Sequence, residues 1–451
     1  MTAALRRPFS SLQVPNYRRY FTGQVISLSG NWMQIVAEIW LVLQLTGSGV
    51  AVGLTTASQF LPILLFGAYG GLLADRFDKR RLLMLTQAAM AIPALALFAL
   101  AVTGLVEAWM VVALAFVRGT VNALDNPARQ SFVIEMVGTE RVVNAVSLNS
   151  VIVHCARMAG PALAGVLIAS VGVQACFLVN AVSFVAMLTA LALMAPAELS
   201  TPPPAAREHG ALRAALRYVA RTPALAVPLA MMALVGTLSF NFQVLLPLLA
   251  RFTFHGGPQT YALLVTAMGV GSVAGALVAG ARGRVTPGLL VAASAAFGIF
   301  TVLAAAAPTL PLTVVALTLI GASSVTFAAG VNSSLQLAVE PAMRGRVMAL
   351  YSVVFLGSTP IGAPIAGALS EAAGPRAGLL LGAAAALTAA SVAYAVLRRR
   401  GESLALQPEV RSRVSCGASR PKASASRPGR GCPEAPAPRA AGPRDAPARS
   451  S

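Results

Sequence analysis

Long apolar segments separated by short basic ones dominate this sequence. No charged residue occurs in residues 158–197 or in residues 285–339. A helix needs about 20 apolar residues to cross the ~30 Å hydrocarbon core of a bilayer, so each stretch is long enough for two such helices. Turn residues, Gly172 in the first stretch and Pro308 in the second, divide them. The pattern predicts an all-α polytopic membrane protein.

The same pattern continues along the chain and predicts twelve transmembrane helices. Only 11% of the residues are charged and 57% are hydrophobic, whereas about 25% of the residues in a soluble domain are charged. This composition excludes an ordinary soluble enzyme and a disordered protein. The expected helices lie near residues 20–45, 51–74, 82–104, 108–127, 143–169, 173–195, 223–250, 259–281, 287–306, 312–338, 346–370 and 376–397.

The basic residues indicate how these helices are oriented. The net charge is +19, and the Lys and Arg residues cluster in short segments between apolar runs. This is the pattern of cytoplasmic loops and not of a nucleic-acid-binding face. If the N-terminus is cytoplasmic, only Arg251 and Arg376 fall in loops on the outer side. We therefore expect a multi-pass protein of the inner (plasma) membrane with both termini in the cytoplasm.

The two halves of the chain resemble each other. Six spans, a polar connector and six similar spans are typical of transporters made of two related halves, which predicts two pseudo-symmetric six-helix bundles. The expected units are residues 1–196, a connector at 197–222 with a short amphipathic helix, residues 223–400, and a disordered basic tail at 401–451. The matched segments are 28–32 with 238–242, Gly71 with Gly275, 147–151 with 349–353, Gly160 with Gly362, and Gly165 with Gly367.

The sequence lacks the motifs of several common enzyme classes. Neither Lys79 nor Lys422 follows a glycine, so the chain contains no GxxxxGK[ST] phosphate loop. The four cysteines form no CxxC pair, and the three histidines are far apart in the sequence. We expect no enzymatic activity, no cofactor and no metal, and we expect that no ATPase within this chain drives transport.

The loop between the second and third spans resembles a family motif. Residues 71–81 read GLLADRFDKRR and resemble the GxxxDRxGRR loop of the major facilitator superfamily, with Asp78 where a glycine is usual. The resemblance implies that Asp75 faces the positive end of another helix and helps to lock the inner gate in the outward-open state. The alternative is a solvated loop that only follows the positive-inside rule. The implied gate residues are Gly71, Asp75, Arg76, Lys79, Arg80 and Arg81.

Two further segments resemble the same superfamily, so the resemblance covers residues 15–397. Residues 114–118 resemble its LxxxR element. Residues 160–165 resemble the GPxxGG element of its antiporter branch, with Ala164 in place of one glycine. Residues 126–165 also resemble the enterobactin-exporter and macrolide-efflux branch. This combination implies the major facilitator fold and a transporter.

The antiporter-type element implies a specific packing of the fifth span. A proline inside a helix removes one backbone hydrogen bond and bends the helix, and glycines let another helix approach closely. In exporters of the family this packing is thought to seal the central pathway and fix the direction of transport. The alternative is helix packing without directional meaning. The element is Gly160, Pro161 and Gly165, and the expected partner in the eighth span is the stripe Gly271, Gly275 and Gly280.

Ionisable residues inside the spans are costly and indicate functional sites. Glu38 lies in the first span on one helical face with Asn31 and Gln34. A carboxylate in an apolar environment can bind and release a proton near neutral pH. We therefore predict that Glu38 couples transport to protons or recognises a cation. The alternative places Glu38 at headgroup level beside Trp40.

Two arginines inside predicted spans require a counter-charge. The resemblance implies that Arg118 is a relay or pairing residue. Arg157 shares a face of the fifth span with His154, and we expect this face to turn toward Arg118. The alternative for His154 is a packed side chain without a role in proton transfer. Because Glu38 alone cannot serve both arginines, either Asp125 or an anionic or polar substrate would have to complete the site.

Asp125 has a second interpretation, because it lies four residues before Arg129 and either pairs with it or caps its helix. The polar residues inside the spans of the second half are neutral, which places any proton chemistry in the first half. The remaining residues expected to line the cavity are Asn122, Asn241 and Gln243.

These observations predict a secondary transporter that works by alternating access. The favoured activity is proton-driven export of a small molecule such as a drug, a macrolide-like compound or a siderophore-like metabolite. One alternative is an importer of a metabolite or organic anion, and another is a non-transporting receptor on the same fold. The expected partners are the substrate, protons and the lipid bilayer, with no nucleic acid, and the expected state is a monomer.

Overall fold

The computed structural model describes residues 7–199, 211–282, 286–340 and 343–399, and within these ranges it leaves out several side chains, including those of residues 68–75 and 154. The helices belong to one compact unit, Met1–Leu406, and the second unit, Gln407–Ser451, lies outside the described residues, as does the whole of the tail predicted at 401–451. In the described part, twelve segments are long and apolar enough to cross a membrane. The prediction of twelve transmembrane helices is therefore confirmed.

The first half of the chain contains six of these spans. Gly47 ends the first span in the left-handed conformation (φ 65°), which glycine adopts without steric cost. The fourth and fifth spans form one long element that turns at Gly138 (φ 71°) into the segments Ala108–Gly138 and Glu140–Ser170. The elements are η1 (Arg7–Gln13), α2 (Pro15–Thr46), α3 (Gly49–Arg76), α4 (Lys79–Thr103), α5 (Ala108–Ser170), α6 (Val173–Ala192) and η2 (Pro196–Glu198).

The second half contains the other six spans, and two of them are interrupted. The seventh span breaks after Leu238 and continues as α9 and a π-helical turn, and the eleventh breaks at Ser358. The sequence predicts both as continuous spans. No proline lies at the first break, but Pro360 lies in the first turn of α14, directly after the second break. The elements are α7 (Ala211–Arg221), α8 (Pro223–Leu238), α9 (Phe242–Leu248), η3 (Leu249–Thr253), α10 (Pro258–Arg282), α11 (Pro287–Ala306), α12 (Leu310–Ala338), α13 (Arg344–Gly357), α14 (Thr359–Ala373) and α15 (Pro375–Arg399).

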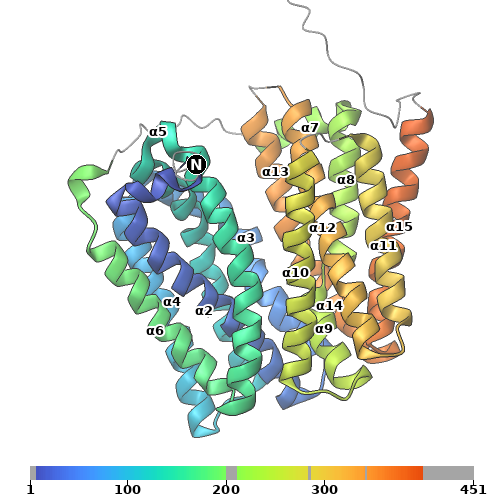
Figure 1. The fold of residues 1–451 in the computed structure, drawn as a ribbon, viewed down its shortest axis with the longest axis horizontal. Helices are drawn as coiled ribbons and strands as arrows, with labels where there is room; N and C mark the ends of the chain where they lie inside the picture. The colour runs from blue at the N-terminus through green and yellow to red at the C-terminus, as the bar shows by residue number, and fades with distance from the viewer. Residues whose placement is uncertain (1–6, 200–210, 283–285, 341–342, 400–451) are drawn as a thin grey trace, which may run out of the picture. The chain divides into compact units, whose positions relative to one another are not determined.

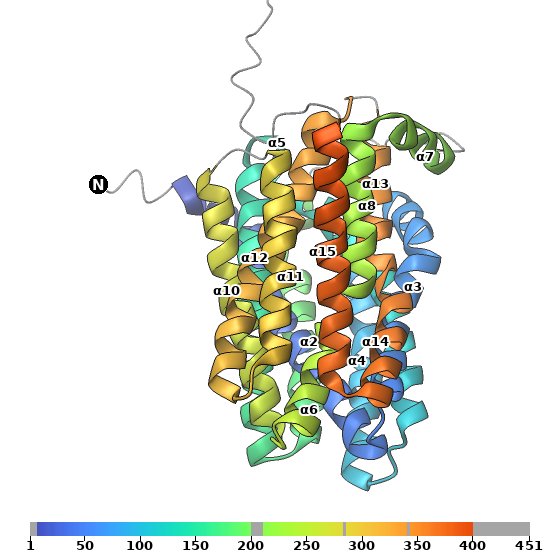
Figure 2. The same cartoon turned by 90° about the vertical axis from the view of Figure 1, so that its right-hand side faces the viewer.

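The spans pack into two bundles (Figure 1). In the N-terminal bundle, α2 packs on α5 and α6, α3 packs on α5, and α4 packs on α5 and α6. In the C-terminal bundle, α10 packs on α12, α11 packs on α12 and α15, and α8 lies beside α15 (Figure 2). The bundles meet where α14 contacts α3, where α10 contacts α5 and where α9 contacts α2.

Matched glycines make equivalent contacts in the two halves. A Cβ atom on Gly160 would lie 2.6 Å from the Cβ atom of Trp32, and one on Gly362 would overlap the carbonyl oxygen of Thr237. Each glycine thus lets one span approach the first span of its own bundle. Gly165 and Gly367 both face the opposite bundle, where added Cβ atoms would overlap Ala262 and Gly49 respectively. This packing agrees with the internal repeat predicted from the sequence.

The sequence predicted that the fifth span packs on the glycine stripe of the eighth span, and this is wrong: the two spans do pack together, but not through these glycines. Added Cβ atoms on Gly271 and Gly275 would clash with the backbone at Thr318 and Ala322 of α12, and one on Gly280 would have no neighbour within 4 Å. The stripe therefore serves packing inside the C-terminal bundle. Span five does pack on α10, but through residues such as Ala262 on a different face of that helix.

Charged side chains of the C-terminal bundle hold the hairpin between α2 and α3. Glu371 at the end of α14 accepts hydrogen bonds from the Ser48 hydroxyl (2.6 Å) and the Val50 amide (3.0 Å), at the N-terminus of α3. Arg251 donates to the carbonyl oxygen of Leu43 (3.1 Å) at the C-terminus of α2. Each charge has the sign that the helix dipole favours. We call this end of the molecule the hairpin end.

Candidate functional site

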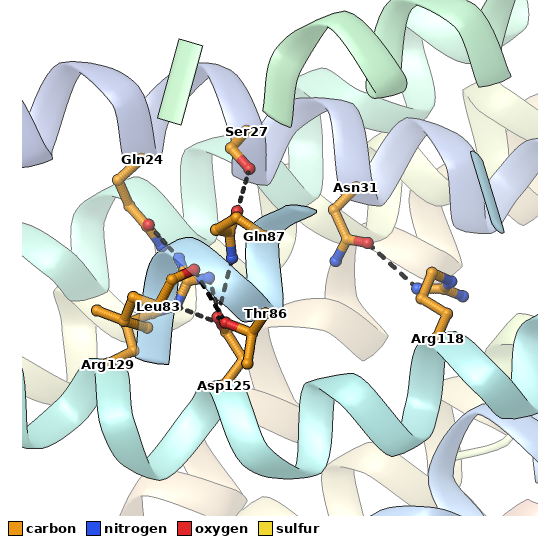
Figure 3. Close-up of polar contacts among 9 residues, drawn as sticks. All are labelled: Gln24, Ser27, Asn31, Leu83, Thr86, Gln87, Arg118, Asp125 and Arg129. Atoms are coloured by element: carbon orange, nitrogen blue, oxygen red, sulfur yellow. Dashed lines mark hydrogen bonds and ion pairs between the residues drawn. The ribbon is translucent and has the colours of Figure 1, made fainter. Parts of the chain in front are cut away.

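Two polar helix faces are opposed inside the N-terminal bundle. On α2, polar residues recur three or four positions apart, as expected for one side of a helix. On the first segment of α5, a second series follows the same spacing, and hydrogen bonds join the two faces at both ends (Figure 3). The two series are Gln24, Ser27, Asn31, Gln34 and Glu38 on α2, and Arg118, Asn122, Asp125 and Arg129 on α5.

Glu38 and Arg118 form an ion pair at one end of these faces. The Oε2 atom of Glu38 lies 2.8 Å from Nη2 of Arg118. Gln34 donates to Oε1 (2.7 Å) and Gln59 of α3 donates to Oε2 (3.2 Å). The Glu38 side chain is 0% exposed and lies inside the N-terminal bundle. Its three partners are all donors, which is the arrangement that an ionised carboxylate requires.

The ion pair is extended by amide side chains. Arg118 also donates to Asn31 through Nη1 (3.1 Å; Figure 3), and Asn180 of α6 donates to the side-chain oxygen of Gln34. That second contact orients Gln34 with its nitrogen toward Glu38. The Nε atom of Arg118 is buried and has no hydrogen-bond partner among the described residues. Removing one member of such a pair leaves the other charge buried without compensation.

Asp125 and Arg129 form a second ion pair toward the other end of the same faces (Figure 3). Asp125 is 1% exposed and also accepts hydrogen bonds from Thr86 (2.7 Å) and Gln87 (2.9 Å) of α4. Arg129 donates in addition to Gln24 of α2. Of the two interpretations of Asp125 left open by the sequence, the structure shows pairing with Arg129.

A cavity of about 230 Å³ lies beside the second ion pair, and both Asp125 and Arg129 line it. Toward the first pair it is lined by Asn31, which accepts a hydrogen bond from Arg118, but neither Glu38 nor Arg118 lines it. A site with this volume and this many polar groups is large enough for several hydrogen-bonded water molecules. The polar residues that line it are Gln24, Ser27, Asn31, Gln87, Asn122, Asp125, Asn126, Arg129, Gln130 and Asn149.

Arg157 is not part of either ion pair. Its guanidinium lies over the ring of Trp32, 4.7 Å from the centroid, and the residue is exposed. No ion pair joins it to a described residue. Arg118 contacts Asn31, and Arg157 contacts the next residue of α2, Trp32; that Arg157 turns toward Arg118 stays a prediction. The side chain of His154 lies outside the described residues.

The neutral residues expected from the second half lie at the break of the seventh span. Asn241 donates to the carbonyl oxygen of Thr237 (2.8 Å). The side-chain oxygens of Asn241 and Gln243 are buried without a hydrogen-bond partner among the described residues. No hydrogen bond in the described part joins these residues to the Glu38 cluster. Broken helices at mid-membrane are typical of substrate and ion sites in transporters.

The predicted gate motif makes its described contacts within the N-terminal bundle. Asp78, which stands where the family has glycine, caps α4 by accepting from the Arg81 amide (2.7 Å). Lys79 pairs with Glu135 (2.5 Å), and Arg80 donates to the carbonyl oxygens of Leu191 and Ala192 at the end of α6. Arg76 is exposed, and the side chain of Asp75, like residue Gly71, lies outside the described side chains.

Sequence reasoning missed several partners of the ion pairs. Gln59 and Asn180 hold the Glu38 cluster, and Thr86 and Gln87 hold Asp125. The sequence does contain a signal for these residues, because an uncharged polar side chain in an apolar span also requires a hydrogen-bond partner. Their place in the site depends on which helices are neighbours, and the periodicity of one helix does not give that information.

Comparison with known proteins gives the family context. The family model described as "Transmembrane secretion effector" matches residues 6–416. The enterobactin exporter EntS of Citrobacter koseri is 28% identical over 79% of this chain and 85% of its own length. The multidrug efflux pump Tap of Mycolicibacterium fortuitum is 27% identical over 84% of this chain and 95% of its own.

A further relative is the staphyloferrin A transporter of Staphylococcus aureus, which is 26% identical over 57% of this chain. That match covers 65% of the relative, which is less than two thirds of its length. Solved structures share the fold. A bacterial homologue of the human lysosomal transporter Spinster superposes with a TM-score of 0.68 at 15% identity, over 85% of this chain and 97% of its own.

Proposed function

Because the chain belongs to the transmembrane secretion effector family of major facilitator superfamily transporters, we propose that it exports a small molecule across the inner membrane in exchange for protons. It is a multi-pass membrane transporter and not an enzyme. Export is supported by relatives named as an enterobactin exporter and a multidrug efflux pump. The substrate class follows from the same names: a siderophore-like or drug-like molecule.

The buried ion pair between Glu38 and Arg118 is the observation that carries proton coupling. When Glu38 takes up a proton, the charge that holds Arg118 and accepts from Gln34 and Gln59 is lost. The first, second and fourth spans meet at this carboxylate, so one protonation changes the contacts among three helices. Proton binding would thereby bias a two-state equilibrium of the helices.

The cavity beside this ion pair supports a route for the proton. It reaches from Asn31, next to Arg118, to Asp125. Water bound by its amide side chains would connect the two carboxylates by hydrogen bonds. We propose that Glu38 exchanges its proton with the cytoplasm through this cavity and past Asp125.

The orientation follows from the charges. We propose that the hairpin end faces outward and that both termini lie in the cytoplasm, as the positive-inside rule requires. The described structure is held closed at the hairpin end by Glu371 and Arg251. Glu38 has an arrangement suited to its ionised form. A closed outer end with an ionised Glu38 is the state that follows proton release into the cytoplasm.

A test of export measures the accumulation of a panel of siderophores and drugs in an efflux-deficient bacterial host. Expression of the protein should lower the accumulation of at least one compound, and a protonophore should restore it. Glu38→Gln should abolish the effect at equal expression. Glu107→Gln is the matched control, because Glu107 is exposed and its side chain accepts a hydrogen bond from Trp109 beside it.

Two outcomes would contradict the proposal. Higher accumulation on expression would show import. Export that persists unchanged in the presence of the protonophore and in Glu38→Gln would show that neither the proton gradient nor this carboxylate drives it.

A further inference from the structure

Arg157 carries the one charge of the central region that no described ion pair neutralises. Glu38 is paired with Arg118, and Asp125 is paired with Arg129. The sequence requires either a carboxylate or an anionic ligand for Arg157, and the structure assigns both nearby carboxylates to other arginines. A charge at membrane depth is costly unless it faces a partner or a water-filled cavity.

The packing of α5 shows which way Arg157 points. Gly160 lies against α2, and Gly165 lies against Ala262 of α10. With about 100° per residue, Arg157 lies roughly 60° from Gly160 and roughly 80° from Gly165 around the helix. Its direction is therefore between α2 and α10. Because these helices belong to different bundles, Arg157 faces the space between the bundles and not the lipid.

The Arg157 guanidinium contacts Trp32 through its central carbon. Gly160 brings the backbone of α5 against Trp32 of α2, one turn after Arg157. The Cζ atom of Arg157 then lies over the indole ring, 4.7 Å from the centroid, which is a favourable cation–π contact. This contact does not use the N–H groups as hydrogen-bond donors to a carboxylate. Those groups have the geometry that binds a carboxylate with two parallel hydrogen bonds.

We propose that Arg157 and Trp32 form the subsite that binds an anionic group of the transported molecule, a carboxylate or an acidic phenolate. This proposal deepens the function proposed above and rests on it. Arg157 supplies the charge and the paired donors, and Trp32 holds the guanidinium by the cation–π contact. Gly160 of the antiporter-type element lets α5 approach α2 closely enough for Arg157 to contact Trp32.

The test uses benzoate as the anionic probe and benzamide as its uncharged analogue of the same shape. Binding to the purified full-length protein is measured by saturation-transfer NMR at one pH, without a proton gradient. Wild-type protein should bind benzoate more tightly than benzamide. Arg157→Gln should weaken benzoate binding by roughly ten- to a hundredfold, as expected for a charge-assisted hydrogen bond, and should leave benzamide unchanged. Arg157→Lys should recover only part of the preference, because lysine lacks the paired donors.

Arg217→Gln is the matched control, since Arg217 is exposed on α7 and should not affect either probe. Thermal unfolding of each variant shows whether it is folded. Equal binding of benzoate by wild type and Arg157→Gln would overturn the proposal, and so would a loss that is equal for benzoate and benzamide. Because the assay has no gradient, such a result would leave the proton coupling at Glu38 untouched.

Discussion

At the scale of single residues, the main feature of the molecule is that each buried carboxylate of the site is paired with an arginine. Glu38 lies among donors from three helices and Asp125 among donors from two, and each carboxylate pairs with one arginine. A buried ion pair is weak evidence for stability, because desolvation offsets most of the Coulomb gain. Breaking such a pair from one side is nevertheless strongly destabilising. Protonation of the carboxylate in such a buried ion pair therefore has a large structural effect.

This reasoning predicts a pH-dependent stability for Arg118→Gln. The variant leaves the Glu38 carboxylate buried without its counter-charge, which should cost about 3–5 kcal/mol. Protonation removes that charge, so the variant should regain stability in acid and lose it as the pH rises. Thermal unfolding of the purified variant in mild detergent at acidic and alkaline pH measures the effect. The double variant Glu38→Gln with Arg118→Gln should lack this pH dependence, and its persistence there would assign it to another group.

At this scale the sequence indicated which charged residues form the site, and it offered the pairing of Asp125 with Arg129 as one of two interpretations. The spacing of Asn31, Gln34 and Glu38 places them on one face, and the structure shows that face in contact with Arg118. The same reasoning placed Arg157 toward Arg118 and did not predict its contact with Trp32. The two arginines contact neighbouring residues of α2: Arg118 contacts Asn31, and Arg157 contacts Trp32. Helix periodicity does not predict which residue of α2 each arginine contacts, because that depends on how three helices cross.

At the scale of helices, the α2–α3 hairpin connects the two bundles. Its two helix termini are bound by Glu371 and Arg251, and its backbone touches the opposite bundle at Gly49, where Gly367 leaves no room for a side chain. Trp40 of α2 and Tyr261 of α10 stack nearby with centroids 6.0 Å apart. Alternating access requires that these contacts open together.

Glu371→Gln should therefore favour opening of the hairpin end. A carboxylate at a helix N-terminus contributes about 0.3–1 kcal/mol through the dipole, so the ratio of open to closed molecules should rise roughly two- to fivefold. Distances between spin labels at Leu45 and Phe252, two exposed positions, measure the two populations. The control is Glu198→Gln, an exposed residue in η2 of the N-terminal bundle.

Gly367→Val should have a larger effect than Glu371→Gln in the same assay. A Cβ on Gly367 would lie 2.2 Å from the carbonyl oxygen of Gly49, so α14 and α3 cannot keep their present distance. The labels should then report mainly the open population. A closed distance as in the wild type would mean that this contact does not hold the hairpin end shut.

The glycines matched between the two halves of the sequence make equivalent helix–helix contacts in the structure. Gly160 and Gly362 approach their own bundles, and Gly165 and Gly367 approach the opposite one. The breaks at Leu238 and Ser358 were not predicted. They lie in apolar runs, and they arise where the two spans pack against each other at Gly236, Gly362 and Ser358. The first break has no proline to signal it, whereas Pro360, in the first turn of α14, is a local signal for the second.

At the scale of the whole molecule, the number of spans and the fold were accessible from the sequence, because hydropathy and length decide how often a chain crosses a bilayer. The proposed orientation is a separate claim and has its own test. Cysteines placed singly at Ser48 and at Arg141, in a variant without native cysteines, can be labelled by a membrane-impermeant maleimide in intact cells. We expect labelling at Ser48 only, and labelling at Arg141 would reverse the orientation.

The central claim is that protonation of Glu38 couples the two bundles to the proton gradient. Proteoliposomes that contain wild type or Glu38→Gln, loaded with the substrate found in cells, separate coupling from transport. Exchange of labelled for unlabelled substrate without a gradient should occur with both proteins. Accumulation driven by a pH gradient should occur with the wild type and be absent with Glu38→Gln. Gradient-driven accumulation by Glu38→Gln at the wild-type level would contradict the claim.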